Sequence, residues 1–340
     1  MIDGASLPLD DKTAAPTRGP HLVSVVLPTY NRAHLLGNAM RSVLGQTYRA
    51  MELIVVDDNS KDDTAEVVRS FDDPRIRYLR NEQNLKLPGG LNRGFAAARG
   101  DFLTWTSDDN LYANTAIERM VEILRQGDCD FVFTDYFHFT ELDEASGEPL
   151  NVQHIRLSPA LELERRNSVG ACFLYTRAVY DGVGLYDPEL FLVEDYDYFI
   201  RVHKHFRIRH LAEPLYYFRR HDDALFCSRY AEVKAADVLV RYKNGLLDKE
   251  TATAACVDLL MRDMEGLKQP LLRTAYPLVR KISFRLTKGF TSVAKRYVAW
   301  KIRAGVWRVL EALSTRELTF RQAKDALRDV LQGIGSVEYR

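Results

Sequence analysis

The sequence predicts an α/β protein built on a mixed, mainly parallel sheet flanked by helices and followed by a helical C-terminal extension. Between about residues 22 and 105, short runs of branched apolar residues alternate with segments of helical apolar spacing, which is the pattern of βαβ units. From about Tyr230 onward, the apolar spacing is helical and few runs resemble strands. These two observations set the fold class.

The first half supplies four strands and three helices in alternation. Its first strand is apolar and β-branched and is stopped by Pro28. The later strands are similar apolar runs, and the second ends in a cluster of turn residues. In chain order we expect strand 23–27, helix 35–45, strand 52–56, helix 61–71, strand 76–79, helix 91–99 and strand 101–105.

The second half changes character and suggests where the domain boundaries fall. Residues 130–139 form an aromatic-rich strand, 170–175 an apolar strand, and 216–218 the end of another aromatic strand. Residues 1–20 are rich in Asp, Pro, Gly and Thr without periodicity, so we expect a disordered leader. The expected domains are the catalytic α/β part at 21–228 and a helical, basic region at 229–340.

Composition excludes several classes of protein. The 47 basic and 47 acidic residues balance, so we expect no chain-wide field for nucleic acid. Four widely spaced cysteines show no zinc-like spacing, and their simplest interpretation is reduced thiols in the cytosol. The start lacks a signal peptide, and no run reaches the ~18 apolar residues that span a bilayer. We therefore expect a cytoplasmic protein.

Three polar segments follow apparent strand ends, at residues 28–31, 57–60 and 107–110. Strand ends share one edge of a parallel sheet, so these segments can converge on one ligand. Asp108 and Asp109 close an apolar run, and their oxygens suit Mg²⁺ or Mn²⁺ bridging to phosphates. Each segment alone is equally good turn or helix-capping chemistry, which leaves that alternative open.

The usual glycine-rich phosphate loops are missing from the sequence. No GxGxxG follows the first strand, and no GxxxxGK[ST] occurs anywhere. Gly89, Gly90 and Gly94 fit neither pattern. These absences argue against a Rossmann dehydrogenase or a P-loop NTPase, and any bound phosphates need a metal and basic side chains for neutralisation.

Two later segments carry further candidate groups. Residues 191–202 hold Glu194, Asp195 and Asp197 among apolar neighbours, where partial desolvation raises a carboxylate pKa and makes a better base. The alternative is acidic residues matching a helix dipole. After the aromatic strand, Arg219 or Arg220 could hold a diphosphate and His221 could ligate a metal, whereas a plain surface role remains open.

Five ordered motifs resemble those of the family 2 glycosyltransferases, which have the Rossmann-like GT-A fold. The resemblance covers about residues 22–221. The motifs are SVVLPTYNR at 24–32, SVLGQTY at 42–48, ELIVVDDNS at 52–60, SDDN at 107–110 and EDYD at 194–197.

The resemblance implies inverting transfer of a hexose-type sugar from a nucleoside diphosphate sugar, most often a UDP-sugar, with Mn²⁺ or Mg²⁺ as cofactor. It implies that Asp195 is the catalytic base and that Asp109 and His221 bind the metal. The implied donor-binding residues are Pro28, Thr29, Tyr30, Arg32, Asp58, Asn84, Lys86, Asn92, Asp108 and Arg220. The implied acceptor contacts are Gly170, Ala171, Cys172 and Glu194.

Departures from the family pattern refine the expected reaction. The metal motif is Asp-Asp-Asn rather than Asp-x-Asp, and the Gln-x-x-Arg-Trp motif of processive synthases is absent. We therefore expect addition of one sugar to a glycan or lipid-linked acceptor in cell-surface polysaccharide synthesis. The alternatives are a non-catalytic nucleotide-sugar-binding relative and a sugar-1-phosphate nucleotidyltransferase, which would need a Gly-rich loop after the first strand.

Residues 266–310 are rich in Lys and Arg, interleaved with apolar and aromatic residues, and contain no Asp or Glu. Basic amphipathic helices of this kind bind anionic membrane surfaces. We expect peripheral attachment to the inner face of the cell membrane, which suits a lipid-linked acceptor. The alternative is a helical bundle that packs on the catalytic domain and leaves a solvated basic face.

Overall fold

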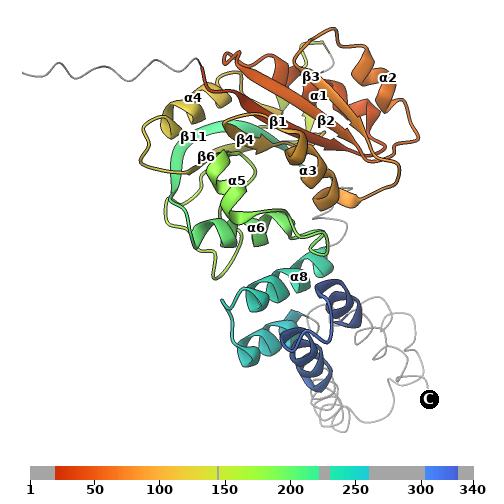
Figure 1. The fold of residues 1–340 in the computed structure, drawn as a ribbon, viewed down its shortest axis with the longest axis vertical. Coiled ribbons are helices and arrows are strands. Elements are labelled where there is room, and N and C mark those ends of the chain that lie inside the picture. The colour runs from red at the N-terminus through yellow and green to blue at the C-terminus, as the bar shows by residue number, and fades with distance from the viewer. Residues whose placement is uncertain (1–19, 144, 222–229, 260–302, 328–340) are drawn as a thin grey trace, which may run out of the picture.

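The computed structural model describes residues 20–143, 145–221, 230–259 and 303–327, and shows a curved sheet with helices on both faces. A helical C-terminal region is attached beyond α6 (Figure 1). The leader expected at 1–20 lies outside the described residues apart from Pro20. The expected mixed, mainly parallel α/β fold with a helical extension is confirmed.

The main sheet runs in the order β3-β2-β1-β4-β10-β6-β11-β5, with β9 paired to β6. Strands β1, β2, β3 and β4 are parallel, β10 is antiparallel to both its neighbours, and β6 and β11 are parallel. The strands are β1 (Val23–Thr29), β2 (Met51–Asp57), β3 (Ile76–Arg80), β4 (Phe102–Trp105), β5 (Leu111–Tyr112), β6 (Phe131–Phe139), β9 (Gln153–Ile155), β10 (Phe173–Thr176) and β11 (Ile208–Arg219). Strands β7 (Glu141–Leu142) and β8 (Pro149–Leu150) form a separate hairpin.

Helices connect these strands and cover the two faces of the sheet, and a last helix, α8, follows β11 and lies beyond α6 (Figure 1). They are α1 (Ala33–Leu44), α2 (Thr64–Arg69), α3 (Lys86–Ala97), α4 (Ala116–Leu124), α5 (Arg177–Val183), α6 (Glu194–His203) and α8 (Tyr230–Lys243). Residues 249–259, 303–314 and 320–327 are also helical.

The expected elements are present with shifted boundaries. Helix α3 starts at Lys86, five residues before its predicted start, because Pro88 is tolerated in a first helical turn. Gly94 lets the same helix approach β1 closely: a Cβ there would lie 2.3 Å from Val26 Cγ1. This close packing fixes the loop before α3 beside the ends of β1 and β2.

Two hydrophobic clusters fill the two sides of the sheet. One includes Val25 and Leu27 of β1 and buried residues of α1 and α4. The other includes Val26, the aromatic residues Phe131, Phe133, Phe173 and Tyr175 of β6 and β10, and the buried apolar residues of α6. The second cluster continues without interruption into α8 and the helices at 249–259, 303–314 and 320–327. The C-terminal helices therefore share a core with α6.

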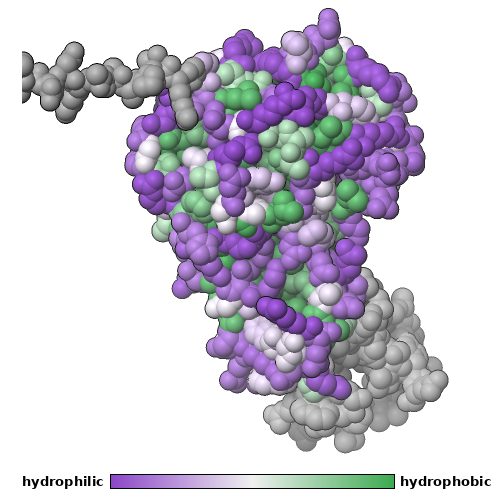
Figure 2. All heavy atoms as spheres, viewed as in Figure 1, coloured by the Kyte–Doolittle hydropathy of each residue, from purple (hydrophilic) through white to green (hydrophobic). Residues whose placement is uncertain are grey.

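Two features of the structure relate to the predicted membrane attachment, namely the surface and the C-terminal helices. Figure 2 shows a face on which hydrophilic residues predominate and apolar ones are scattered. Within the described ranges, no helix combines the length and apolarity needed to cross a bilayer. Most of the basic segment at 266–310 lies outside the described residues. Its last part is helical, and Val306 and Leu310 are buried in the shared core.

Candidate functional site at the carboxyl edge of the sheet

The ends of β1, β2 and β4 lie side by side at one edge of the sheet. In the parallel register, Thr29 lies opposite Asp57. Val26 lies opposite Trp105, so the segment 107–110 leaves β4 beside the end of β1. The predicted convergence of these segments is confirmed, as expected for strands that share a direction.

Five side chains meet at this edge in what we call the carboxylate cluster: Thr29, Arg32, Asp108, Asp109 and His221. Thr29 donates a hydrogen bond from Oγ1 to Asp108 Oδ2 at 2.8 Å. Arg32 donates from Nη1 to Asp109 Oδ2 at 2.7 Å and to Asp108 Oδ1 at 3.2 Å. His221 Nε2 lies 3.3 Å from Asp109 Oδ2. The two residues implied as metal ligands, Asp109 and His221, are therefore in contact.

The electrostatics of the cluster favour a cation. Burial and the neighbouring charge of Asp109 raise the pKa of Asp108 to about 6, although Arg32 and Thr29 act in the opposite direction. Burial lowers the pKa of Arg32, but the two carboxylates outweigh it and the net pKa is raised. The guanidinium therefore stays charged and partly neutralises two carboxylates that repel one another.

These residues fit a divalent cation that also binds a diphosphate. Asp109 Oδ2 already contacts both a guanidinium and an imidazole nitrogen, so the position selects positive charge. Among the described residues, no group of three or more His, Cys, Asp or Glu could hold an ion by itself. Mg²⁺ sites commonly use one or two carboxylates and take their remaining ligands from substrate phosphates and water.

Asp58 organises a second part of the edge. The carboxylate is 5% exposed and accepts hydrogen bonds from Asn81 Nδ2, Leu85 N and Lys86 N at 2.7–2.8 Å. These bonds fold residues 81–86 around the end of β2. One lone pair on Oδ2 remains free, so Asp58 can still accept a bond from a ligand such as a base N–H.

Backbone strain concentrates around the same edge. Asn31, Asn59, Lys86 and Leu192 have positive φ angles of 53°, 69°, 61° and 91°. Asn tolerates this region, whereas Lys and Leu do so at a cost. Such residues persist where the surroundings determine the backbone strongly, which is common at functional sites.

The acidic pair Glu194-Asp195 begins α6, directly after the strained Leu192. Glu194 is 5% exposed and accepts a hydrogen bond from Leu192 N at 2.8 Å. Asp195 is half-buried and accepts bonds from Asn167 Nδ2 at 3.0 Å and Tyr196 N at 2.7 Å. Burial raises the pKa of both carboxyls, and the charge of Asp195 adds to the effect on Glu194. Asp195 therefore has the proton affinity that suits a general base.

Two contacts attach the loop before α6 to α3 and its preceding turn. Asn92 Nδ2 donates to Tyr186 O at 2.8 Å, and Tyr186 N donates to Asn92 Oδ1 at 2.9 Å. Lys86 Nζ lies 5.5 Å from the centre of the Phe191 ring. The loop that carries the acidic pair is therefore fastened to the segment organised by Asp58.

The other residues implied for the donor lie around this edge with fewer contacts. Tyr30 is 45% exposed, so its ring face is open to a ligand, and Pro28 is half-buried at the end of β1. Asn84 and Arg220 are exposed, and Arg220 N donates to Phe139 O. Their donor-binding roles, like that of Asn92, stay predictions.

The residues implied for the acceptor differ in their accessibility. Gly170 has φ 77°, and a Cβ there would lie 2.9 Å from Leu157 Cδ1, so glycine suits the position. Ala171 is half-buried, whereas Cys172 is fully buried and burial raises the pKa of its thiol to about 12. The Cys172 thiol lies in the core and not at the surface. Acceptor contacts of this segment stay predictions.

Two side-chain contacts at the site, those of Asn81 and Asn167, were not predicted from the sequence. Asn81 follows β3 directly, so the rule that polar residues gather at strand ends could have identified it. Asn167 lies in the irregular segment 156–172, where no apolar periodicity gives a side chain a direction. Its contact with Asp195 therefore required the structure.

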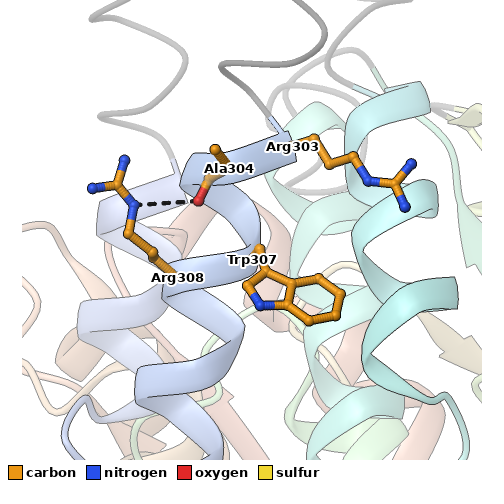
Figure 3. A pocket seen from close by; sticks show the side chains of 4 residues that line it. All are labelled: Arg303, Ala304, Trp307 and Arg308. Carbon is orange, nitrogen blue, oxygen red and sulfur yellow. Dashed lines mark hydrogen bonds between the residues drawn. The ribbon is translucent and has the colours of Figure 1, made fainter.

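A separate hollow of about 410 Å³ lies in the C-terminal region, lined by Arg303, Ala304, Trp307 and Arg308 (Figure 3). Arg303 pairs with Glu250 at 3.4 Å. The residues that line this hollow are far along the chain from those of the carboxylate cluster.

In the comparisons with known proteins, the family match lies largely in the first half of the chain. Residues 24–184 match the family model described as "Glycosyl transferase family 2". An uncharacterized glycosyltransferase of Rickettsia conorii is 33% identical over 194 residues, or 53% of this chain and 31% of that protein. The Escherichia coli protein named UDP-Glc:alpha-D-GlcNAc-diphosphoundecaprenol beta-1,3-glucosyltransferase is 33% identical over 116 residues, or 34% of this chain and 46% of that protein. This chain spans 31–57% of the length of the first curated relatives that it matches.

Solved structures support the fold. S. aureus TarS has a TM-score of 0.51 at 17% identity, over 94% of this chain and 55% of that one. The mannosyltransferase PcManGT from Pyrobaculum calidifontis, solved with GDP-Man and Mn²⁺, has a TM-score of 0.53 at 14% identity, over 96% and 89% of the two chains. At these identities the likeness establishes the fold alone, which is GT-A.

Proposed function

Because the domain at residues 24–184 belongs to glycosyl transferase family 2, we propose that this protein transfers one sugar from a UDP-sugar to a lipid-linked glycan acceptor. The observation that carries the proposal is the carboxylate cluster at the sheet edge, where Asp109 contacts both Arg32 and His221. The E. coli relative, whose name specifies a UDP-Glc donor and a diphosphoundecaprenol-linked acceptor, supports these substrate classes.

The donor is bound in an extended arrangement along the sheet edge. Asp58 and the exposed ring of Tyr30 hold the nucleoside, with Asp58 accepting a hydrogen bond from the base. Thr29 and Asp108 lie between the nucleoside and the metal ligands, beside the ribose or donor sugar. Arg32 and Arg220 supply positive charge to the diphosphate.

Asp109 and His221 would hold Mn²⁺ or Mg²⁺ beneath the diphosphate. Such an ion acts as a Lewis acid that neutralises charge on the departing diphosphate. PcManGT, a protein of the same fold, was solved with Mn²⁺. An ion bound to Asp109 Oδ2 would displace Arg32 from this oxygen and leave its guanidinium able to bind the diphosphate.

Asp195 acts as the general base in a single displacement. Its carboxylate takes the proton of the acceptor hydroxyl as that oxygen bonds to the anomeric carbon, and the bond from this carbon to the diphosphate breaks. Attack from the face opposite the leaving group inverts the anomeric centre, so no protein nucleophile is needed. The raised pKa of Asp195 and its hydrogen bond from Asn167 support this role.

The acceptor lies between the segment 167–172 and the start of α6, where Glu194 holds the backbone of Leu192. A lipid-linked acceptor suits attachment to an anionic membrane through the basic residues at 266–310, each contributing about 1 kcal/mol near such a surface. Flotation with vesicles containing anionic lipid tests this attachment, and vesicles of neutral lipid are the control. Absence of binding at moderate salt contradicts it.

A thermal-shift panel tests the donor site directly. UDP-, GDP-, dTDP- and CMP-sugars are each tested with and without Mn²⁺, using the full chain and the Asp109→Ala variant. A ligand at 100 times its Kd adds about 2.7 kcal/mol of stability. We expect a Mn²⁺-dependent shift with UDP-sugars that is lost in Asp109→Ala. Equal shifts in both proteins would contradict the metal role of Asp109.

A further inference from the structure

The first turn of α6 is fastened to the C-terminal helical region by a buried carboxylate. Asp197, two residues after Asp195, is 1% exposed. Its Oδ2 accepts a hydrogen bond from Arg201 Nε at 2.8 Å. Its Oδ1 accepts one from Asn244 Nδ2 at 2.9 Å and lies 3.5 Å from Lys243 Nζ.

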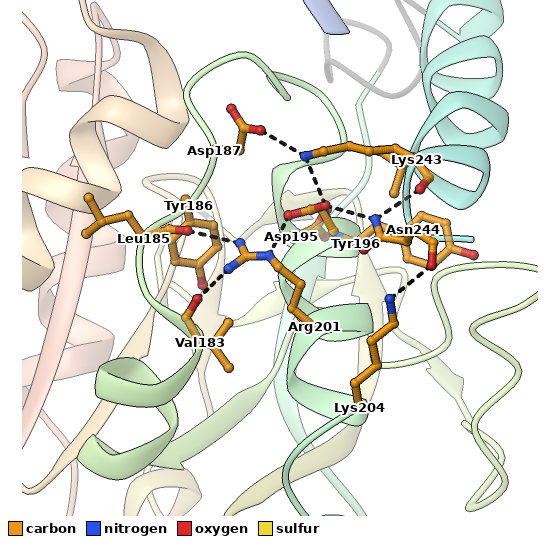
Figure 4. A network of polar contacts seen from close by, with 12 residues as sticks. Val183, Leu185, Tyr186, Asp187, Asp195, Tyr196, Arg201, Lys204, Lys243 and Asn244 are labelled. Atoms are coloured by element: carbon orange, nitrogen blue, oxygen red, sulfur yellow. Dashed lines mark hydrogen bonds and ion pairs between the residues drawn. The ribbon is translucent and has the colours of Figure 1, made fainter. Parts of the chain in front are cut away.

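Lys243 also reaches the loop on the other side of the acidic pair. Its Nζ donates to Asp187 Oδ2 at 2.9 Å (Figure 4). Burial acts against ionisation of Asp187, but the bonds from Lys243 and Glu189 N together with the charges of Lys243 and Arg201 outweigh it, and the net pKa of Asp187 is lowered. One ammonium therefore joins residues 187 and 197, which bracket the strained Leu192 and the pair Glu194-Asp195.

The C-terminal end of α8, with Lys243 and the following Asn244, is held in place by further hydrogen bonds. Asn244 N donates to Val240 O at 3.0 Å, and Lys204 Nζ at the end of α6 donates to Asn244 O at 2.9 Å. Phe320 N donates to Glu189 Oε2 at 3.1 Å, which ties the last described helix to the same loop. The shared hydrophobic core of α6, α8 and the later helices makes this a rigid support.

From this arrangement we propose that Lys243 and Asn244 are positioning residues that hold Asp195 in its productive place through Asp197 and Asp187. A strained backbone such as that of Leu192 persists only when its surroundings determine it strongly, and Lys243 supplies such a restraint on both sides. The C-terminal helical region is then part of the catalytic machinery. The inference rests on the proposed function, in which Asp195 is the base.

Kinetics distinguish positioning from a general loss of folding. Displacement of a catalytic group by about 1 Å can lower turnover by roughly 100-fold. The variant Lys243→Met is therefore expected to lower kcat by about tenfold or more. The donor-binding residues lie on other elements, so the KM for the donor should stay within about twofold. Lys243→Arg keeps the charge and should restore most of the turnover.

Lys249→Met is the matched control. Lys249 lies in the next helix, pairs with Glu311, and places Nζ 4.2 Å from the centre of the Trp307 ring. It is thus a lysine of the same region with a carboxylate partner, and its contacts are with the helix 303–314. Its replacement should weaken that helix pair and leave kcat unchanged.

The experiment combines two measurements on full-length wild type, Lys243→Met, Lys243→Arg and Lys249→Met. The first is UDP release from UDP-glucose and UDP-N-acetylglucosamine with Mn²⁺ and an N-acetylglucosamine-diphosphoundecaprenol acceptor. The second is hydrogen–deuterium exchange, which needs no substrate. We expect faster exchange in peptides covering 187–200 and a lower kcat at unchanged KM in Lys243→Met alone.

Two results would overturn the inference. One is exchange over 187–200 that is the same in Lys243→Met and Lys249→Met. The other is faster exchange in Lys243→Met with wild-type kcat. Failure of the proposed function looks different: the wild type would release no UDP from either donor, and the exchange result would still decide whether Lys243 restrains this segment.

Discussion

The guanidinium of Arg32 donates a 2.7 Å hydrogen bond to Asp109 Oδ2, the oxygen that the proposed metal binds. Guanidinium and metal ion therefore compete for one carboxylate oxygen. The competition links metal entry to the release of a cationic side chain beside the diphosphate position.

The variant Arg32→Gln should bind Mn²⁺ more tightly in the absence of nucleotide. Removing an ion pair worth about 1 kcal/mol strengthens binding by roughly fivefold. Isothermal titration with Mn²⁺ measures the change, and Arg220→Gln is the control because Arg220 is exposed. Weaker Mn²⁺ binding by Arg32→Gln would show that Arg32 assembles the ligands and does not compete with the ion.

Asp58→Ala should destabilise the protein and weaken nucleotide binding together. The change removes the acceptor for Asn81, Leu85 and Lys86, and lost hydrogen bonds of this kind cost about 1–3 kcal/mol in total where water can partly replace them. Thermal unfolding and UDP titration report the two effects. The exposed Asp63→Ala in the same segment should change stability by less than about 0.5 kcal/mol.

Asp195→Asn should raise the stability of the protein near pH 8. Burial raises the folded-state pKa of Asp195, so the unfolded chain loses its proton first and the wild type loses stability as pH rises between the unfolded and folded pKa values. An amide avoids this loss. We expect a gain of about 1 kcal/mol, or roughly 2–4 °C in Tm. The gain should vanish near pH 3, where both states are protonated, and a gain independent of pH would contradict the explanation.

Asn167→Ala should move the acid limb of the kcat–pH profile to higher pH. Asn167 Nδ2 donates to Asp195 Oδ2 and stabilises the ionised carboxylate, so its loss raises the pKa of the base further. Turnover measured from pH 5 to 8 reports the shift, with the half-buried Asn38→Ala in α1 as the control. An unmoved limb would mean that another group controls the acid side.

Much of the donor-binding part of the site can be predicted from the sequence, because it depends on local sequence patterns. Apolar runs define the strands, and polar residues after parallel strands must share an edge, which brings Thr29 to Asp108 across 79 positions. The start of α3 was less predictable, because the Pro and Gly residues near its start suggest a loop.

The part of the site around the proposed base Asp195 could be predicted only in part. The acidic pair is visible in the sequence, but its partners are not. Asn167 lies in irregular chain, and Lys243 comes from a helix whose docking depends on the shared core. No periodicity or spacing encodes such contacts. The structure also shows Arg32 bound to the carboxylates, whereas the sequence suggested only a donor contact.

The most direct test of the central claim compares wild type with Asp195→Asn. UDP-glucose and UDP-N-acetylglucosamine are supplied with Mn²⁺ and an N-acetylglucosamine-diphosphoundecaprenol acceptor, and donor affinity is measured separately by titration. We predict sugar transfer by the wild type, and in Asp195→Asn an unchanged donor Kd with turnover lower by at least about 100-fold, the usual contribution of a general base. Transfer by Asp195→Asn at close to the wild-type rate would contradict the account.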